Sequence, residues 1–143
     1  MKLCVAGPRA VQSKTGESRV LSFVERQDIQ AVLTAFANGR AITELVSGGA
    51  TGVDQLAEKW ADKNSIVVKQ FLPEWDKYAP TKPGAKNPAA IIRNREMAEY
   101  ADAVIVFWDQ VSRGSKNMIE TATQLGKLWM VLPLNYDQPG GLQ

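Results

Sequence analysis

Short apolar runs alternate along the chain with longer segments in which apolar residues recur every three or four positions. Five of the short runs are rich in β-branched or aromatic residues and are bounded by Gly, Pro or Asp. We predict that these are strands, at residues 2–7, 42–48, 66–72, 103–108 and 128–133. The periodic segments between them predict helices over 22–39, 51–64, 87–101 and 115–126. This alternation is typical of an α/β fold in which helices cover both faces of a parallel sheet.

The order of elements also predicts where a ligand binds. Right-handed crossovers give a five-stranded, mostly parallel sheet in the order 3-2-1-4-5, in a single domain over residues 1–134. We expect the tail at 135–143 to be loosely held. The switch point lies between the first and fourth strands, and ligands bind there beyond the carboxyl ends. Three turns converge on it: GPR (7–9), SGGATG (47–52) and WDQVSRGS (108–115).

The turn at 47–52 carries more glycine than a tight turn requires. Gly48 and Gly49 lack the Cβ atoms that would hold a ligand away from the main chain, and Gly52 opens the next helix. Free N–H groups at a helix start attract anions, so we expect a phosphate to bind there. The segment at 113–115 predicts a second anion site of the same kind, with the guanidinium of an arginine added.

The same residues also have explanations that need no ligand. Thr51 and Asp54 have the spacing of a capping box, and Ser115 suits the N-cap position of its helix. Gly52 is explained equally well by close packing of the helix. The residues of the turns therefore leave both interpretations open.

Two further segments are candidates for ligand contact. Asn94 falls on the apolar face of its predicted helix, where a buried amide needs partners, and Arg93 precedes it. Asn94 suits either a brace between the turns or a direct ligand contact. The irregular segment at 73–87 has aromatic and basic residues suited to stacking on a base and pairing with phosphate, namely Trp75, Tyr78, Lys82 and Lys86. A packed lid with solvated lysines explains that loop nearly as well.

The amino-acid composition excludes several classes of catalytic and metal-binding site. The chain has 143 residues, a formal net charge of +2, no histidine and one cysteine, Cys4. Without histidine there is no imidazole-based catalysis, and with a single cysteine zinc has no ligand set, so we expect no metal and no cofactor. The lone cysteine cannot form an intramolecular disulfide, and no run suits a secretory signal or a membrane span. We therefore expect a cytoplasmic protein that does not bind membranes.

The chain resembles the SLOG superfamily in three segments: VSGGATGVDQLAEKWA, RNREM and ADAVIVFW…SRGSKNMIETATQLGK. It is most similar to the small single-domain branch related to YspA and YpsA, and the likeness extends from CVAGPR to LWMVLP. The superfamily includes the Lonely Guy phosphoribohydrolases and the Rossmann-like part of the DNA-processing protein DprA. The resemblance implies a Rossmann-like domain that binds a nucleotide or nucleotide-derived ligand in the predicted crevice. Some members dimerise, so it also allows a homodimer.

The residues that we expect at the ligand lie in the three turns and on the helix that carries RNREM. They are Gly7, Pro8, Arg9, Ser47, Gly48, Gly49, Thr51, Gly52, Asp54, Arg93, Asn94, Trp108, Arg113, Gly114 and Ser115.

One departure from the superfamily bears on catalysis. Its hydrolases carry a PGGxGTxxE motif, in which the glutamate works with an arginine to cleave an N-glycosidic bond. Alignment of Gly114 and Ser115 with the Gly-Thr pair places Met118 at the glutamate position. Glu120, two residues later, is turned about 200° around the helix. Arg93 is preserved as the cationic partner, but the acid is missing.

We therefore expect a binding protein that senses, carries or sequesters a small-molecule ligand such as an ADP-ribose or NAD derivative. The alternative is a phosphoribohydrolase or another nucleoside N-glycosidase, with catalytic groups among Asp54, Arg93, Glu120 and Asp109. Single-stranded DNA binding, by analogy with DprA, is a weaker alternative. Nucleic acid is an unlikely partner because a net charge of +2 with scattered lysines provides little basic surface.

Overall fold

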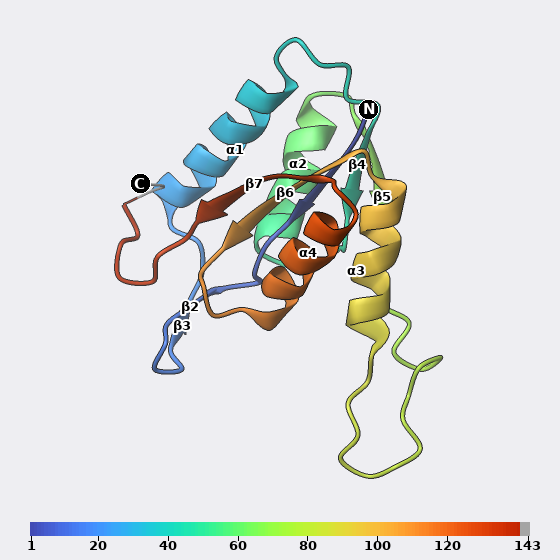
Figure 1. Cartoon of the computed structure of the whole chain (residues 1–143). Coiled ribbons are helices and arrows are strands. Elements are labelled where there is room, and N and C mark those ends of the chain that lie inside the picture. Colours follow the sequence, from blue (N-terminus) through green and yellow to red (C-terminus); the bar gives the residue numbers. More distant parts are fainter. Residues whose placement is uncertain (141–143) are drawn as a thin grey trace.

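Five parallel strands form the central sheet of this computed structural model, which describes residues 1–140 (Figure 1). They are β1 (Lys2–Ala6), β4 (Glu44–Ser47), β5 (Val67–Gln70), β6 (Ala103–Trp108) and β7 (Leu128–Pro133). Their order is β5-β4-β1-β6-β7, and every neighbouring pair is parallel. If these five strands are numbered 1 to 5 in chain order, the sheet has the predicted order 3-2-1-4-5. The predicted switch point then lies between β1 and β6. The predicted fold class is confirmed.

Helices cover both faces of the sheet. On one face α1 (Phe23–Ala37) and α2 (Val53–Lys63) pack on side chains such as Leu3 and Ile105. On the other, α3 (Ala89–Tyr100) and α4 (Arg113–Gln124) pack on side chains such as Cys4 and Val104. Consecutive residues of β1 and β6 thus enter different cores, because side chains alternate along a strand. This explains why the central strands are continuous apolar runs rather than alternating ones.

Two helices begin at other residues than the sequence predicted. Helix α2 begins at Val53 with Gly52 at its N-cap position, so the predicted capping box of Thr51 and Asp54 is absent. The Asp54 carboxylate accepts a hydrogen bond from the N–H of Ala50 (3.2 Å) instead. Helix α4 begins at Arg113, with position 112 as its N-cap, so the prediction that residue 115 is the N-cap was wrong.

A short hairpin occupies the segment at 8–21, for which the sequence predicted no regular structure. Its strands are β2 (Val11–Gln12) and β3 (Ser18–Arg19), which pair antiparallel outside the main sheet. Strands of two residues are too short to show a periodic pattern, so the sequence does not reveal them. The N–H of Gln12 donates to the Asp109 carboxylate (2.8 Å), which ties the hairpin to the end of β6.

A buried ion pair fixes the start of α1. The Glu25 carboxylate is fully buried and accepts hydrogen bonds from Arg19 Nη1 (2.6 Å) and Nη2 (3.0 Å). Glu25 also forms a capping box with Ser22. Burial opposes ionisation of Glu25, but the hydrogen bonds from Arg19 and Ser22 outweigh it and hold the pKa of the carboxyl below its ordinary value.

The same arginine contacts the residues that follow β7. Arg19 Nε donates to the carbonyl of Tyr136 (3.0 Å), and Nη2 donates to that of Asn135 (2.9 Å). These hydrogen bonds join the beginning of the tail at 135–143, which we predicted to be loosely held, to the α1 side of the domain. Residues 141–143 of that tail lie outside the described part of the chain.

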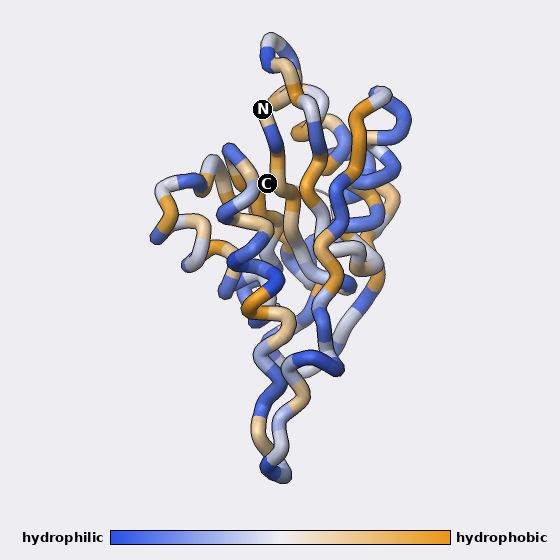
Figure 2. The backbone as a smooth tube through the Cα atoms, turned by 90° about the vertical axis from the view of Figure 1, so that its right-hand side faces the viewer, coloured by the Kyte–Doolittle hydropathy of each residue, from blue (hydrophilic) through white to orange (hydrophobic). Residues whose placement is uncertain are grey.

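The segment between β5 and α3 projects from the rest of the molecule in both views (Figures 1 and 2). Most of its residues are hydrophilic in Figure 2, in contrast to the central strands. Asn87 Nδ2 donates to the carbonyl of Trp75 (2.8 Å) and joins the two ends of the loop. Within residues 1–140, no helix combines the length and apolar character that crossing a membrane requires.

Candidate functional site

A cavity of about 250 Å³ lies beyond the carboxyl ends of β1 and β6, at the predicted switch point. Its wall consists of the turn after β1, the starts of α2 and α4, and one face of α3. The lining residues are Ala6, Gly7, Pro8, Arg9, Gln12, Ala50, Asp54, Ala90, Arg93, Asn94, Met97, Ser112, Arg113, Gly114 and Ser115.

The cavity contains only part of the predicted set. The structure brings together Gly7, Pro8, Arg9, Asp54, Arg93, Asn94, Arg113, Gly114 and Ser115. It leaves outside the lining Ser47, Gly48, Gly49, Thr51, Gly52 and Trp108. Gln12 and Ser112 line the cavity but were not expected there. Ser112 was predictable from the sequence, since a serine directly before a helix start is a typical N-cap residue. No sequence pattern marks Gln12 as a site residue.

The start of α4 is open to the cavity. Ser112 occupies the N-cap position, but its side chain makes no hydrogen bond to the helix. Its hydroxyl donates to the Asp109 carboxylate (2.7 Å), which also accepts from the N–H of Ser112 (2.7 Å). The N–H groups of the first turn are therefore left without a side-chain cap, at the positive end of the helix dipole. Asp109 therefore supports the turn before α4 and does not line the cavity.

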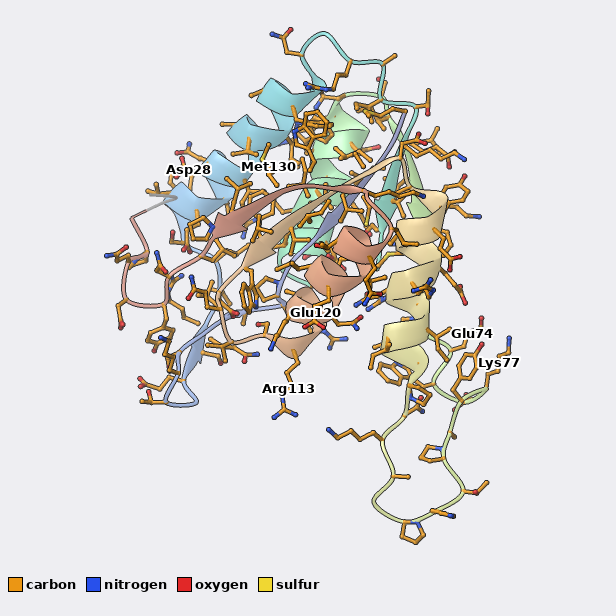
Figure 3. The ribbon with its side chains drawn as sticks, in the orientation of Figure 1. Asp28, Glu74, Lys77, Arg113, Glu120 and Met130 are labelled. Atoms are coloured by element: carbon orange, nitrogen blue, oxygen red, sulfur yellow. The ribbon has the colours of Figure 1, made fainter. Side chains whose placement is uncertain are left out.

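The first turn of α4 also offers space and charge. A Cβ atom added at Gly114 would meet no atom within 4 Å, so this part of the wall is open. Arg113 is exposed, and its side chain extends from the helix start away from the sheet (Figure 3). An anion at these amides would therefore also be within the field of a guanidinium.

The start of α2, by contrast, is closed by the protein itself. The turn after β1 packs on it, and the N–H of Val53 donates to the carbonyl of Pro8 (3.3 Å). Gly52 has φ +79°, and a Cβ there would lie 2.6 Å from the Pro8 oxygen and closer still to that of Arg9. Gly52 thus allows close approach of main chain, not of a ligand. The N–H of Val53 is thus paired with a backbone carbonyl, and the anion site that the sequence suggested at 47–52 stays a prediction.

Gly48 allows two charged side chains to approach the same turn. A Cβ at Gly48 would lie 2.7 Å from Arg93 Nη1 and 2.9 Å from Asp54 Oδ2. Arg93 Nη1 donates to the carbonyls of Gly48 (2.9 Å) and Phe71 (3.3 Å). Arg93 is thereby fixed to the turn after β4, although it belongs to α3. The guanidinium and the carboxylate form one side of the cavity wall together.

Burial opposes the charged form of both groups of this pair. It raises the pKa of the Asp54 carboxyl to about 6, although the N–H of Ala50 and the positive charges of Arg93 and Arg9 act in the opposite direction. Burial also lowers the pKa of the Arg93 guanidinium from its ordinary value, against the attraction of Asp54. Asp54 therefore changes its charge near neutral pH, directly at the cavity wall.

Asn94 joins α3 to the open start of α4. It is buried, and its Nδ2 donates to the carbonyl of Gly114 (3.2 Å) and to Asn117 Oδ1 (3.0 Å). Its Oδ1 accepts a hydrogen bond from Arg93 Nε (3.2 Å). Asn94 thus lines the cavity and holds the two helices in register, so both roles considered for it from the sequence are compatible with its position.

The other candidate catalytic acids lie elsewhere. Met118, at the position of the hydrolase glutamate, is fully buried beneath α4. Glu120 is exposed on α4 and lines a groove between α3 and α4, outside the cavity (Figure 3). Of the carboxylates in residues 1–140, Asp54 is the one that lines the cavity. In the described residues, no group of three or more Cys, Asp or Glu side chains is placed to hold a metal ion.

The remaining predicted residues support the turns from outside the cavity. Ser47 Oγ donates to Glu58 Oε2 (2.6 Å), and Trp108 Nε1 donates to the carbonyl of Ser112 (3.0 Å). Gly49 packs against Leu72 rather than facing the cavity. None of residues 73–87 lines the cavity, including the aromatic and basic residues that we considered for base stacking.

Comparison with known proteins agrees with the fold. The family model YAcAr, described as the YspA, cpYpsA-related SLOG family, matches residues 1–78. The X-ray structure of DNA processing protein A (DprA) from Streptococcus pneumoniae superposes with a TM-score of 0.65 at 23% sequence identity. The alignment covers 96% of this chain and 52% of that one, so this chain spans about half of its structural neighbour. No curated protein sequence matches the chain.

The packing at Gly52 predicts a large cost for adding one methyl group. We expect Gly52→Ala to lower the free energy of unfolding by about 3 kcal/mol or more, because positive φ and two backbone carbonyls both oppose it. Gly126→Ala is the matched control: φ is +69° there, but nothing lies within 4 Å of the added Cβ. We expect it to cost about 1 kcal/mol. Urea denaturation of both variants measures the difference, and equal losses would contradict the close packing.

The position of Asp54 predicts a carboxyl that titrates with a midpoint near pH 6 in ¹³C NMR. Because the pKa in the folded protein lies above the ordinary 3.8, its contribution to stability is present at low pH and is lost as pH rises through 6. Arg93→Gln should raise the midpoint, since the positive charge that lowers the pKa is gone. Arg95→Gln, exposed on the same helix, should leave it unchanged. A midpoint below 5 would refute the assignment.

Proposed function

Because this chain belongs to the YspA, cpYpsA-related SLOG family, we propose that it binds a nucleotide or nucleotide-derived ligand at the carboxyl edge of its sheet. Family membership supports a nucleotide-related role in general. In our proposal the protein is a cytoplasmic sensor, carrier or sequestering protein, and compounds that contain ADP-ribose or derive from NAD are the first ligands to test.

The observation that carries the proposal is the uncapped start of α4 in a cavity that also contains Arg9 and Arg93. A phosphate bound at the amides of the first turn would replace the missing cap and be paired with fixed positive charge. The side chains of Asp54 and Gln12 supply polar groups for ribose hydroxyls, and Ala90 and Met97 supply apolar surface for a base. The lining thus has each kind of contact that a nucleotide requires.

The size of the cavity indicates one nucleotide unit. Its volume of about 250 Å³ is slightly below the range of about 300–1,000 Å³ typical of pockets for drug-sized ligands. A larger compound such as ADP-ribose would therefore extend beyond the cavity. The position of the wall residues favours an extension past Arg9, which is exposed at its edge.

We expect isothermal titration calorimetry to show binding of at least one compound among ribonucleoside 5′-monophosphates, ADP, ADP-ribose and NAD. Arg93→Gln should weaken it about tenfold or more through loss of a charge-assisted contact. Arg95→Gln, which changes the same net charge outside the cavity, should have no effect. Gly114→Leu should also abolish binding, because its side chain would fill the open wall at the first turn of α4.

Thermal denaturation serves as the control for folding. Gly114 lies within α4 and has open space around it, so a variant there should melt close to the original protein. Flat titrations with every compound, using protein with a cooperative unfolding transition, would refute the proposal. Binding that survives Gly114→Leu unchanged would place the ligand elsewhere.

Hydrolysis of an N-glycosidic bond is a second candidate, favoured by one observation. Asp54 lines the cavity with a pKa of about 6, which suits a general base or a stabiliser of an oxocarbenium ion near neutral pH. Its Oδ2, however, already accepts the N–H of Ala50 and lies beside Arg93, and the motif glutamate of the hydrolases is replaced by Met118. Binding without cleavage is therefore the better-supported function.

Incubation with nucleoside 5′-monophosphates and chromatography for the free base distinguish the two functions. We expect no release of base above the rate without protein, because no second carboxylate lines the cavity. Release that disappears in Asp54→Asn, with binding retained, would establish hydrolysis and assign Asp54 to it. Release that persists in Asp54→Asn would point to a contaminating enzyme or to another catalytic group.

A further inference from the structure

A second hollow, of about 220 Å³, adjoins the candidate site on the other side of Gly52. Arg9, Arg26 and Lys59 line it, together with the polar Thr51 and Gln55. Among the described residues no carboxylate contributes to its wall. Three cations thus share one hollow in a chain whose formal net charge is only +2.

Among the described residues, Arg26 and Lys59 have no carboxylate partner, and Arg9 has only the charge of Asp54, beyond salt-bridge distance. Within residues 1–140, the side chains of Arg9, Arg26 and Lys59 make no hydrogen bond and no salt bridge. Arg19 and Arg93, by contrast, are held by carboxylate or carbonyl oxygens. Like charges that converge without an anion repel one another, so the hollow is electrostatically complementary to a phosphate.

The hollow continues the candidate site rather than standing apart from it. Arg9 lines both cavities, so a ligand can extend from one to the other past this side chain. On its far side the hollow shares Arg26 with a shallow depression that contains Phe23. Phe23 is 73% exposed, and an aromatic side chain at this exposure beside cations suits stacking on a base.

We propose that the Arg9–Arg26–Lys59 hollow is a second anion subsite, which holds the second phosphate of a ligand built from two nucleotide units. The first unit occupies the cavity at α4, so the inference rests on the function proposed above. The base of the second unit packs on Phe23. A ligand of two units matches the two adjoining hollows, whereas a single nucleotide fills the first and leaves Arg26 and Lys59 unpaired.

The experiment compares each ribonucleoside 5′-monophosphate with the corresponding 5′-phosphorylated dinucleotide, pNpN, by isothermal titration calorimetry. For the base that binds best, we expect pNpN to bind about tenfold tighter or more, because the second phosphate binds at high effective concentration. Arg26→Gln combined with Lys59→Gln should remove this gain and leave the affinity of the monophosphate within about twofold. Lys63→Gln, exposed on the same helix outside both hollows, is the control and should retain the gain.

The outcomes separate this inference from the proposed function. Binding of a monophosphate with no gain for pNpN, or a gain that survives in the double variant, would overturn the second subsite alone. Failure of every monophosphate and every dinucleotide to bind would overturn both. A further tenfold gain from pNpN to the tetranucleotide would replace the two-unit ligand with an open groove for single-stranded nucleic acid. Thermal denaturation of the double variant checks that it is folded.

Discussion

Close packing at Gly52 determines where this protein has room for a ligand. The carbonyl oxygens of Pro8 and Arg9 lie so near the start of α2 that a Cβ atom would not fit. This contact joins the turn after β1 to the turn after β4, two segments that are far apart in the sequence. It closes the start of α2 and leaves the start of α4 as the open side of the cavity. Gly52 therefore contributes directly to packing and affects the space for a ligand only indirectly.

The two helix starts therefore differ in their electrostatic role. At α2 the protein supplies its own oxygen atoms, from Pro8 to the first helical N–H and from Asp54 to Ala50. At α4 the serine that would cap the helix donates its hydroxyl to Asp109 instead, so the first turn remains open. A buried carboxylate and three arginines, Arg9, Arg93 and Arg113, line the same space. The result is one open helix start with an ionisable group beside it, and the proposed binding of a phosphate ester rests on this arrangement.

The cavity and the second hollow share Arg9 and are separated by the Gly52 turn. The packing that closes α2 thus also divides the ligand-accessible surface into two parts. One part has an open helix start, and the other has unpaired side-chain cations. Membership of the SLOG family supports a nucleotide-related role in general, and our proposal assigns that role to the first part. The second follows from the positions of Arg26 and Lys59, which belong to α1 and α2 and meet only in the folded chain.

The sequence by itself determined the five strands of the main sheet, the four helices to within a few residues and the sheet order, because apolar periodicity and the chirality of crossovers follow local and general rules. It also identified the three turns, since glycine and polar residues mark them. It did not determine which helix start is open: Gly48 and Gly52 suggested phosphate contacts, but in the structure they allow the approach of Arg93 and of backbone carbonyls. Only the tertiary structure decided this, because a glycine shows that something comes close to the main chain, while the identity of that neighbour depends on residues distant in the sequence.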